Sequence, residues 1–302
     1  MNSDSPPPVV VIMGPTASGK SALALRFARE RNGEIVSADS MQLYRGLEIG
    51  TAQPTPAERA EIPHHLVGCF DFHERIDVFT YCRLADEAIA EIRARGHLPI
   101  VAGGTGFYIK SLLYGLDDLP ADPVLRRELD ARYDSDAAED ELRTRLAELD
   151  PAAALKFARC RRRMLRALEV VILTGKSILE LQRRREPHLR FPVEAWRLDP
   201  APDELKRRIA RRTDAMLADG WIDEARTALA RGLLDTPTAW QALGYRQIGD
   251  FLAGKCDYET MRQRIVTATW QFARRQRTWF AHQHPEGRLC QKQRPTPTAL
   301  TI

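Results

Sequence analysis

Residues 14–21 read Gly14-Pro15-Thr16-Ala17-Ser18-Gly19-Lys20-Ser21, which matches the phosphate-loop pattern G-x-x-x-x-G-K-[ST]. The preceding stretch, Val9–Met13, is short, apolar and β-branched, and residues 22–31 carry apolar side chains at helical spacing. Strand, loop and helix therefore follow one another. In such a loop, backbone N–H groups surround phosphate oxygens, Lys20 adds a positive charge and Ser21 a hydroxyl for Mg²⁺. We expect all eight residues to bind a pyrophosphate group, from a nucleoside triphosphate or another donor, with Mg²⁺ as the cofactor.

Short apolar runs further along the chain predict more strands, at residues 34–37, 99–102 and 193–198. Helical patterns alternate with them, at residues 80–95, 202–218, 222–231 and 258–282. This alternation indicates an α/β fold with a P-loop NTPase-like parallel sheet flanked by helices. Ligands of such sheets bind beyond the carboxyl ends of the strands. Asp39 and Thr105 each follow a predicted strand, so we expect both beside the phosphate loop.

The alternation of predicted strands and helices stops after Leu116, where acidic residues and prolines interrupt it. Helical patterns without strands follow, at residues 125–133, 140–149 and 163–173. We therefore predict a catalytic core made of residues 1–115 and 191–302, with an inserted helical domain at 116–190. The composition of the last dozen residues predicts disorder.

Composition narrows the class of protein. The apolar fraction is 44% and the charged fraction 28%, as in ordinary globular proteins. The sequence contains no run of about 18 apolar residues, the length that a membrane-spanning helix needs. The five cysteines never form a C-x-x-C pair, which argues against a disulfide framework or a zinc site. The net charge of +4 permits nucleic acid as a partner without requiring it. We expect a cytoplasmic protein with no membrane contact.

Asp39 is the first candidate for catalysis. It follows the strand predicted at residues 34–37 and would lie next to the phosphate loop. A carboxylate there can act as a general base or hold Mg²⁺ through water. A structural reading stays open, in which the side chain caps a turn or a helix.

A series of motifs in a fixed order resembles the bacterial tRNA dimethylallyltransferases, from about Val9 to Phe280. Besides the phosphate loop, the matching motifs are Asp39-Ser40 with Gln42 and Tyr44, Ile49-Gly50-Thr51-Ala52, Pro63-His64-His65-Leu66, Gly103-Gly104-Thr105 with Tyr108, Arg166-Ala167-Leu168-Glu169-Val170, Gly244-Tyr245-Arg246, and Arg275-Gln276 with Thr278-Trp279-Phe280. Two departures stand out. Gln53 occupies a position where the family usually has lysine, and residues 157–161 differ from the family pattern.

The resemblance implies a reaction. In that family an allylic diphosphate binds the phosphate loop, and N6 of adenosine-37 in the tRNA anticodon loop attacks its C1 and releases pyrophosphate. The adenine amine is a poor nucleophile, so a base at the attacking nitrogen is useful. The resemblance gives this role to Asp39, with Thr105 beside it, and makes Arg212 the arginine that stabilises the leaving pyrophosphate. It implies dimethylallyl diphosphate as donor and a protein that acts as a monomer.

The resemblance also implies contacts with the anticodon stem-loop of tRNA. They involve three segments and two further residues, namely Asp39, Ser40, Met41 and Gln42; Arg162, Arg163, Met164, Leu165 and Arg166; Gln241, Ala242, Leu243, Gly244, Tyr245 and Arg246; and Thr105 and Arg126. Residues 159–166 contain five arginines and no acid, a composition typical of a phosphate-binding track. Solvated helix faces explain other runs of charge equally well.

Other functional classes share part of this pattern. A small-molecule P-loop kinase would share the loop, the sheet and a nearby carboxylate, but not the basic helical insertion. An RNA-binding ATPase would need a Walker B strand, four apolar residues ending in aspartate, and we find none beside the loop. A prenyltransferase acting on free adenylate would not need the arginine-rich C-terminal helices.

Overall fold

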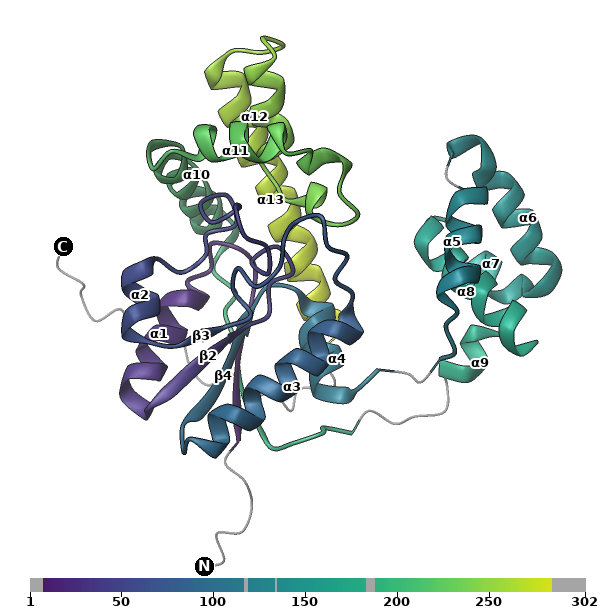
Figure 1. Ribbon diagram of the computed structural model, residues 1–302, viewed down its shortest axis with the longest axis horizontal. Helices are drawn as coiled ribbons and strands as arrows, with labels where there is room; N and C mark the ends of the chain where they lie inside the picture. Colours follow the sequence, from purple (N-terminus) through teal and green to yellow (C-terminus); the bar gives the residue numbers. More distant parts are fainter. Residues whose placement is uncertain (1–7, 117–118, 134, 183–187, 284–302) are drawn as a thin grey trace, which may run out of the picture. The chain divides into compact units, whose positions relative to one another are not determined.

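The computed structural model describes residues 8–116, 119–133, 135–182 and 188–283. The chain divides into two compact units, residues 1–115 with 189–302 and residues 116–188. The second division thus falls at 188/189, where the sequence analysis placed it at 190/191. Figure 1 shows a sheet with its helices in the first unit and only helices in the second. The disorder expected for the last dozen residues concerns positions outside the described residues.

The sheet of the first unit has the strand order β3-β2-β4-β1-β5, and all its neighbouring strands are parallel. Its strands are β1 (Val9–Met13), β2 (Gly33–Ser37), β3 (His64–His65), β4 (Leu98–Gly103) and β5 (Val193–Arg197). The predicted α/β fold with a parallel sheet is confirmed. β1 lies between β4 and β5 and is buried along its whole length, which explains why it is apolar throughout.

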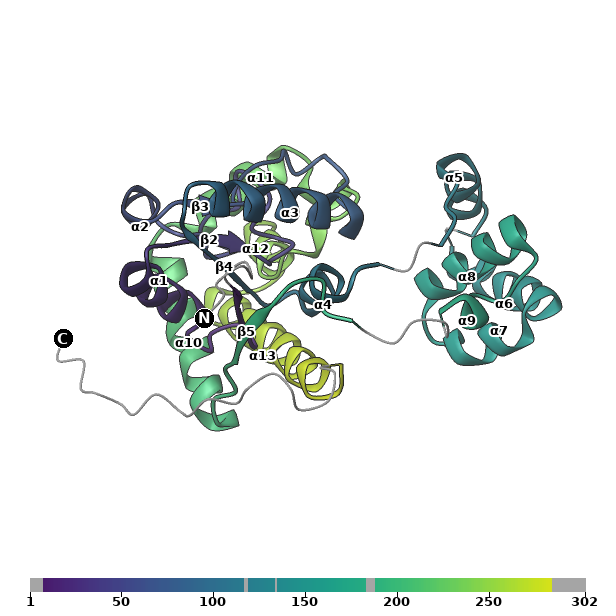
Figure 2. The same ribbon diagram turned by 90° about the horizontal axis from the view of Figure 1, so that it is seen from below.

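Helices cover both faces of this sheet. α1 (Lys20–Arg31) and α3 (Val78–Ala94) join strands in opposite directions along the sheet, so right-handed crossovers put them on opposite faces (Figure 2). The buried face of α1 packs Phe27 and Ala28 with Val10 and Ile100 of the sheet. The other helices of this unit are α2 (Pro56–Glu61), α4 (Gly106–Tyr114), α10 (Pro202–Ala218), α11 (Trp221–Ala230), α12 (Tyr245–Leu252) and α13 (Tyr258–His282), with 3-10 turns at Leu233–Asp235 and Ala239–Gln241.

The second unit is built from helices around its own apolar core. They are α5 (Pro123–Arg132), α6 (Glu139–Leu149), α7 (Pro151–Phe157), α8 (Arg161–Thr174) and α9 (Ile178–Gln182), with a 3-10 turn at Asp136–Ala138. Leu142, Leu146, Met164 and Leu168 are fully buried in the centre. Aspartate N-caps fix the starts of two of these helices, since Asp122 accepts hydrogen bonds from the first turn of α5 and Asp150 accepts one from the first turn of α7. In the described part of either unit, no helix is long and apolar enough to span a membrane.

The carboxyl ends of three adjacent strands, β2, β4 and β1, converge at one edge of the sheet. Gly103 at the end of β4 packs so closely on the segment after β2 that a Cβ atom there would lie 2.1 Å from the carbonyl oxygen of Ala38. Ala38 N in turn donates to Ala102 O (2.9 Å), and Thr105 N donates to Ala38 O (3.0 Å). These contacts bring the loop after β2 and the loop after β4 together beside the phosphate loop.

Candidate active site

The phosphate loop connects β1 to α1 in a conformation that depends on its glycines. Gly14 has φ +152° and lies so close to the backbone that a Cβ atom would be 2.4 Å from Leu198 O. Gly19, the N-cap of α1, has φ +96°, in the left-handed region that glycine tolerates. The Ser18 hydroxyl is buried and has no hydrogen-bond partner among the described residues. The loop therefore has a preformed turn at a helix N-terminus and a buried polar group free to bind a ligand.

Two partly buried cations lie at this loop. Lys20 Nζ donates to Pro15 O (2.6 Å), and burial lowers the pKa of Lys20 to about 8, with Asp39 opposing the shift and Arg212 adding to it. Arg212 Nη1 donates to Thr16 Oγ1 (3.2 Å), and burial lowers the pKa of Arg212, while Asp39 opposes the shift. The ammonium and the guanidinium lie close enough to affect each other, so an anion bound between them would relieve their repulsion.

Arg208 is a third cation at the loop, which the sequence analysis did not separate from its neighbours. It lies one helical turn before Arg212 on α10, and its Nη1 donates to Ser18 O (3.3 Å). Arg211, between them in sequence, is exposed. Spacing of i and i+4 puts two side chains on the same helix face, so the helix period was the signal that could have identified this pair.

Asp39 lies at the end of β2, within electrostatic reach of both Lys20 and Arg212. Its Oδ1 accepts a hydrogen bond from Met41 N (3.0 Å), so the side chain also closes a local turn. It is not the N-cap of any helix that the structure describes. The turn-closing bond uses one carboxylate oxygen and leaves the other available to a substrate.

Thr105 joins the loop after β4 to the segment that follows Asp39. Its Oγ1 accepts from Ser40 N (3.0 Å) and donates to Ser40 Oγ (3.3 Å). The structure thus brings Asp39, Thr105 and Lys20 to one edge of the sheet, as their order in the chain predicts, and Arg212 lies there too. Thr105 acts on the backbone beside Asp39 and holds that segment in place.

The other residues of the segment after β2 divide between surface and internal contacts. Ser40 and Met41 are partly exposed. The side chain of Gln42 is used internally, since its Nε2 donates to Ala52 O (2.9 Å) and its Oε1 accepts from Ser37 Oγ (2.9 Å). Gln42 was predicted to contact tRNA, but its amide instead stabilises the loop around Ala52.

The segment from Gln241 to Arg246 is anchored by a buried tyrosine. Tyr245 Oη donates to Glu224 Oε1 (2.7 Å), and Glu224 also accepts from the backbone N–H of Ile49 and Gly50. Tyr245, Gly244 and Ala242 are buried, and a Cβ atom at Gly244 would lie 2.1 Å from the ring of Trp221. Only Gln241 and Arg246 of this segment are exposed. Glu224 could not be identified from the sequence, because nothing in its local pattern indicates that its carboxylate binds the backbone of residues 49 and 50.

The predicted phosphate track in the second unit needs a correction. Arg126 and Arg166 both pair with the buried Glu169, one helical turn beyond the acid-free run, and Arg166 also donates to Pro120 O and Leu119 O. Met164 and Leu165 belong to the apolar core. The outward-facing members of the predicted set are Arg162 and Arg163, which are exposed.

A hydrogen-bonded link between two loops of the site was also missed. Gln276 of α13 is buried, and its Oε1 accepts from Thr16 N (2.8 Å) while its Nε2 donates to Gly104 O (2.9 Å). It thereby ties the phosphate loop to the loop after β4. The family motif containing Gln276 was recognised, but a motif does not show which way a helical side chain points.

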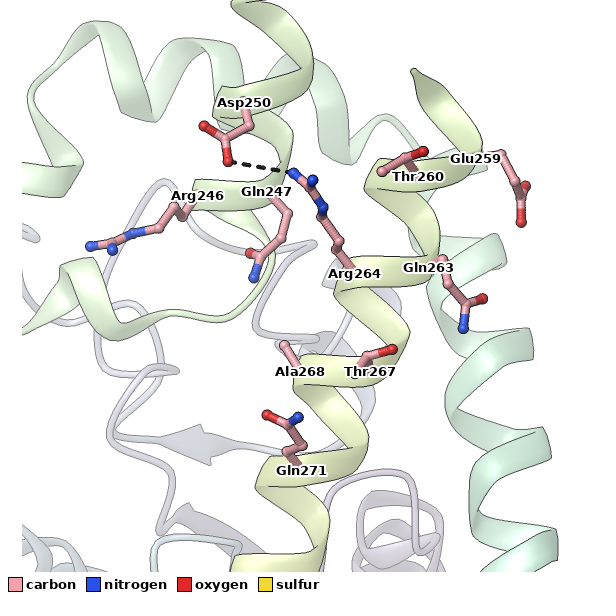
Figure 3. A pocket seen from close by; sticks show the side chains of 10 residues that line it. All are labelled: Arg246, Gln247, Asp250, Glu259, Thr260, Gln263, Arg264, Thr267, Ala268 and Gln271. Carbon is pink, nitrogen blue, oxygen red and sulfur yellow. Dashed lines mark ion pairs between the residues drawn. The ribbon is translucent and has the colours of Figure 1, made fainter. Parts of the chain in front are cut away.

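A separate open pocket of about 630 Å³ lies between α12 and α13 (Figure 3). Most of its lining residues carry polar or charged side chains, and Arg264 forms an ion pair with Asp250 (3.9 Å) across it. Arg246 is the one predicted site residue that lines it, and no residue of the phosphate loop does. The predicted chemistry therefore does not centre on this pocket.

Comparisons with known proteins identify the family of the chain. The family model described as IPP transferase matches residues 42–283, and the one described as isopentenyl transferase matches residues 7–63. The tRNA dimethylallyltransferase of Methylococcus capsulatus is 46% identical, over 93% of this chain and 91% of the relative. That of Halorhodospira halophila is also 46% identical, over 91% and 90%.

Two solved structures are also similar. The tRNA isopentenylpyrophosphate transferase of Bacillus halodurans has a TM-score of 0.65 and 36% identity, over 91% of this chain and 87% of that one. A eukaryotic dimethylallyltransferase described as acting on tRNA has a TM-score of 0.79 and 31% identity, over 90% and 69%. The matched family model spans most of the chain, and the relatives align over nearly all of it. The chain belongs to the IPP transferase family, and its close relatives are tRNA dimethylallyltransferases.

Proposed function

We propose that this protein transfers a dimethylallyl group from dimethylallyl diphosphate to N6 of adenosine-37 in the anticodon loop of tRNA, with release of pyrophosphate. The observation that carries the proposal is the position of Asp39. One carboxylate interacts electrostatically with two partly buried cations, Lys20 and Arg212, at the phosphate loop. A base beside an anion site is what an attack on an allylic diphosphate requires, and the family relationship supports that reaction.

On the donor side, the C1–O bond breaks and negative charge develops on the departing pyrophosphate. Backbone N–H groups of the phosphate loop other than that of Thr16, which donates to Gln276, would stabilise that charge together with the ammonium of Lys20 and the guanidinium of Arg212. Because both cations are already desolvated, they need little reorganisation when the charge develops. The buried Ser18 hydroxyl offers one further donor.

On the acceptor side, N6 of the adenine forms the new bond to C1 and must lose a proton. Asp39 takes that proton as general base, with the carboxylate oxygen that does not accept from Met41 N. Thr105 acts as a positioning residue, because its hydroxyl fixes the backbone of Ser40, next to Asp39. The products are the N6-prenylated adenosine and pyrophosphate.

Ser21 is the residue that would hold Mg²⁺. It is exposed in the first turn of α1, where its hydroxyl can supply one ligand. Mg²⁺ binds few protein groups and takes its other ligands from substrate phosphates and water, so the residues present fit it. When bound, the ion would neutralise part of the charge on the leaving pyrophosphate.

The tRNA substrate must present its target adenine outside the base stack. Contacts with the rest of the tRNA are proposed for the partly exposed Ser40 and Met41 and for the exposed Arg162, Arg163, Gln241 and Arg246. Arg246 stacks over the exposed ring of Trp240, 5.6 Å from its centroid, an arrangement suited to contacts with bases. We propose a monomer that works in the cytoplasm, where tRNA is modified.

Incubation of the purified protein with Mg²⁺, dimethylallyl diphosphate and unmodified tRNA tests the proposal. Digestion of the tRNA and mass spectrometry of its nucleosides should give adenosine heavier by one isopentenyl unit, with no nucleoside triphosphate added. Transfer that needs ATP, phosphorylation of a small molecule, or ATP hydrolysis stimulated by RNA without prenylation would support the kinase or ATPase alternatives instead.

A further inference from the structure

The side chain of Gln276 makes two hydrogen bonds that join segments far apart in the sequence. Thr16 N in the phosphate loop donates to its Oε1 (2.8 Å), and its Nε2 donates to Gly104 O (2.9 Å) in the loop after β4. Only 6% of Gln276 is exposed. One backbone donor of the phosphate loop is therefore used by the protein itself and is not available to a phosphate oxygen.

The helix that carries Gln276 is packed tightly against the loop after β4. A Cβ atom at Gly104 would lie 2.4 Å from Gln276 Nε2, and one at Gly106 would lie 2.2 Å from the ring of Trp279 on the same helix. Phe280, one turn after Gln276, is also buried. The packing of α13 thus fixes the position of the amide. Through its two hydrogen bonds, the amide fixes the positions of the two loops.

Thr16 is held from two sides. Its backbone N–H binds Gln276, and its hydroxyl accepts from Arg212 Nη1. Gly104, the other partner of Gln276, immediately precedes Thr105, whose hydroxyl binds Ser40 beside Asp39. A short chain of hydrogen bonds therefore runs from the anion site to the segment that carries the proposed base.

We propose that Gln276 is a positioning residue that sets the distance between the bound pyrophosphate and Asp39 by clamping the phosphate loop to the loop after β4. This rests on the proposed function of the loop as the diphosphate site. The bond to Thr16 N turns that donor away from the ligand and fixes the remaining N–H groups of the loop. The bond to Gly104 O keeps Thr105, and through it Ser40, at a constant distance from the loop.

The chemistry of the clamp is specific to an amide, because it needs one acceptor and one donor at the same reach. Gln276→Met keeps the length and loses both hydrogen bonds. Gln276→Glu accepts from Thr16 N as a carboxylate but cannot donate to Gly104 O, and it adds a negative charge near the anion site. A protonated Glu has an acceptor and a donor again. The glutamate variant should therefore regain function in acid, which a purely steric role would not predict.

The test is calorimetric binding of inorganic pyrophosphate with Mg²⁺ to the full chain at pH 5.5 and pH 8, expressed as the Kd ratio of variant to wild type. For Gln276→Met we expect a ratio of about ten at both pH values, the loss of one to two hydrogen bonds. For Gln276→Glu the Kd ratio at pH 8 should be larger than that of Gln276→Met. At pH 5.5 the Gln276→Glu ratio should be at least tenfold lower than its own value at pH 8. Steady-state kinetics should show a raised KM for dimethylallyl diphosphate and an unchanged KM for tRNA.

Gln271→Glu is the matched control, since it adds the same charge at an exposed position of the same helix (Figure 3), and its ratio should stay near one at both pH values. Thermal melts report folding, and the glutamate variant at pH 5.5 keeps the test usable if the methionine variant unfolds. Ratios near one for both variants, or a glutamate ratio that does not change with pH, would overturn the proposal. A wild-type protein that binds pyrophosphate but transfers no prenyl group would count against the proposed function alone.

Discussion

Arg212 Nη1 donates a hydrogen bond to Thr16 Oγ1 over 3.2 Å, which places a partly buried guanidinium directly on the phosphate loop. The two residues belong to α10 and to the loop after β1, so the contact forms only in the folded protein. Arg212 has no carboxylate partner among the hydrogen bonds of the described residues, although Asp39 interacts with it through space. A buried cation without a paired acid is costly unless an anion binds there.

We therefore predict that Arg212→Ala lowers kcat by about 10² to 10³, as expected when one preorganised donor to a developing charge is removed. Arg212→Lys should rescue only part of this loss, because an ammonium cannot reproduce the planar fork of a guanidinium. Arg211→Ala is the control, since Arg211 is exposed on the same helix and should leave kcat within about twofold. Equal losses for the two alanine variants would contradict the assignment.

The pKa of Lys20, lowered to about 8 by burial, predicts a pH dependence of donor binding. The ammonium form, which binds the diphosphate, prevails below pH 8 and is lost as the pH rises above it. The KM for dimethylallyl diphosphate should then increase by up to about tenfold per pH unit above pH 8. Lys20→Arg stays charged in this range, so its KM, although higher at pH 7, should not show that increase. A wild-type KM that stays constant to pH 10 would argue against the shifted pKa.

Glu34 illustrates a charged group that stabilises the fold away from the proposed chemistry. It is buried in β2 and accepts hydrogen bonds from Arg95, which lowers its pKa to about 2 against the opposing effect of burial; His65 and His97 contribute further. Because the folded-state pKa is depressed, this contribution is present above the unfolded pKa and is lost as the pH falls from about 4.5 towards 2.

Glu34→Gln should accordingly reduce the free energy of unfolding at pH 7 by about 2 to 4 kcal/mol. The difference from wild type should shrink at pH 3, and kcat of the folded variant should be unchanged. Glu61→Gln breaks an exposed, solvent-screened pair with Arg29 and should change the free energy of unfolding much less than Glu34→Gln does. Denaturant unfolding at the two pH values measures both effects, and a Glu34→Gln difference that is the same at pH 3 and pH 7 would refute the linkage.

The exposed arginines of α8 give a prediction for RNA binding. Replacing Arg162 and Arg163 together by alanine should weaken tRNA binding and flatten the slope of log K against log salt by about 0.7 to 0.9 per lost phosphate contact. Donor affinity should not change. The control is alanine at Arg132 and Arg145, exposed residues of the same unit that pair with acids. An unchanged slope would make Arg162 and Arg163 a solvated helix face.

Arg166 should behave differently from these two. It pairs with the buried Glu169 through a 2.6 Å contact, so Arg166→Ala should destabilise the helical unit rather than change the salt slope of tRNA binding. Removal of one partner of a buried ion pair typically costs about 3 to 5 kcal/mol. Thermal melts and salt-dependent binding of the same variant separate the two effects, and a normal melting temperature with a flatter slope would restore Arg166 to the phosphate track.

The parts of the site that could be predicted from the sequence are those fixed by chain order. A strand followed by the glycine loop defines the anion site, and Asp39 and Thr105 follow strands whose carboxyl ends must share one edge of a parallel sheet. α4 was missed because Gly103-Gly104-Thr105-Gly106 reads as a loop, whereas the helix starts at Gly106 itself. β3 was missed because two residues carry no periodic signal.

The parts that could not be predicted depend on which way side chains point across long separations. Gln276 lies 260 residues from Thr16, and no local pattern indicates that its amide binds that backbone. The side chains of Arg126 and Arg166 point inward because both pair with Glu169. This acid lies three residues after the end of the arginine-rich, acid-free run at residues 159–166. Charge counted along a sequence does not separate paired arginines from free ones, because helix geometry decides which acid each one meets.

The central claim, that Asp39 is the general base, is tested most directly by the single-turnover rate of Asp39→Asn with saturating dimethylallyl diphosphate and tRNA. The amide still accepts from Met41 N, so the fold and both affinities should persist, while the rate constant falls by roughly 10² to 10⁴. Asp122→Asn is the control, because Asp122 Oδ1 likewise accepts a hydrogen bond from the backbone N–H two residues later, that of Val124. This variant should leave the rate unchanged. A near-normal rate constant for Asp39→Asn with a lowered melting temperature would contradict the account and leave Asp39 a structural residue.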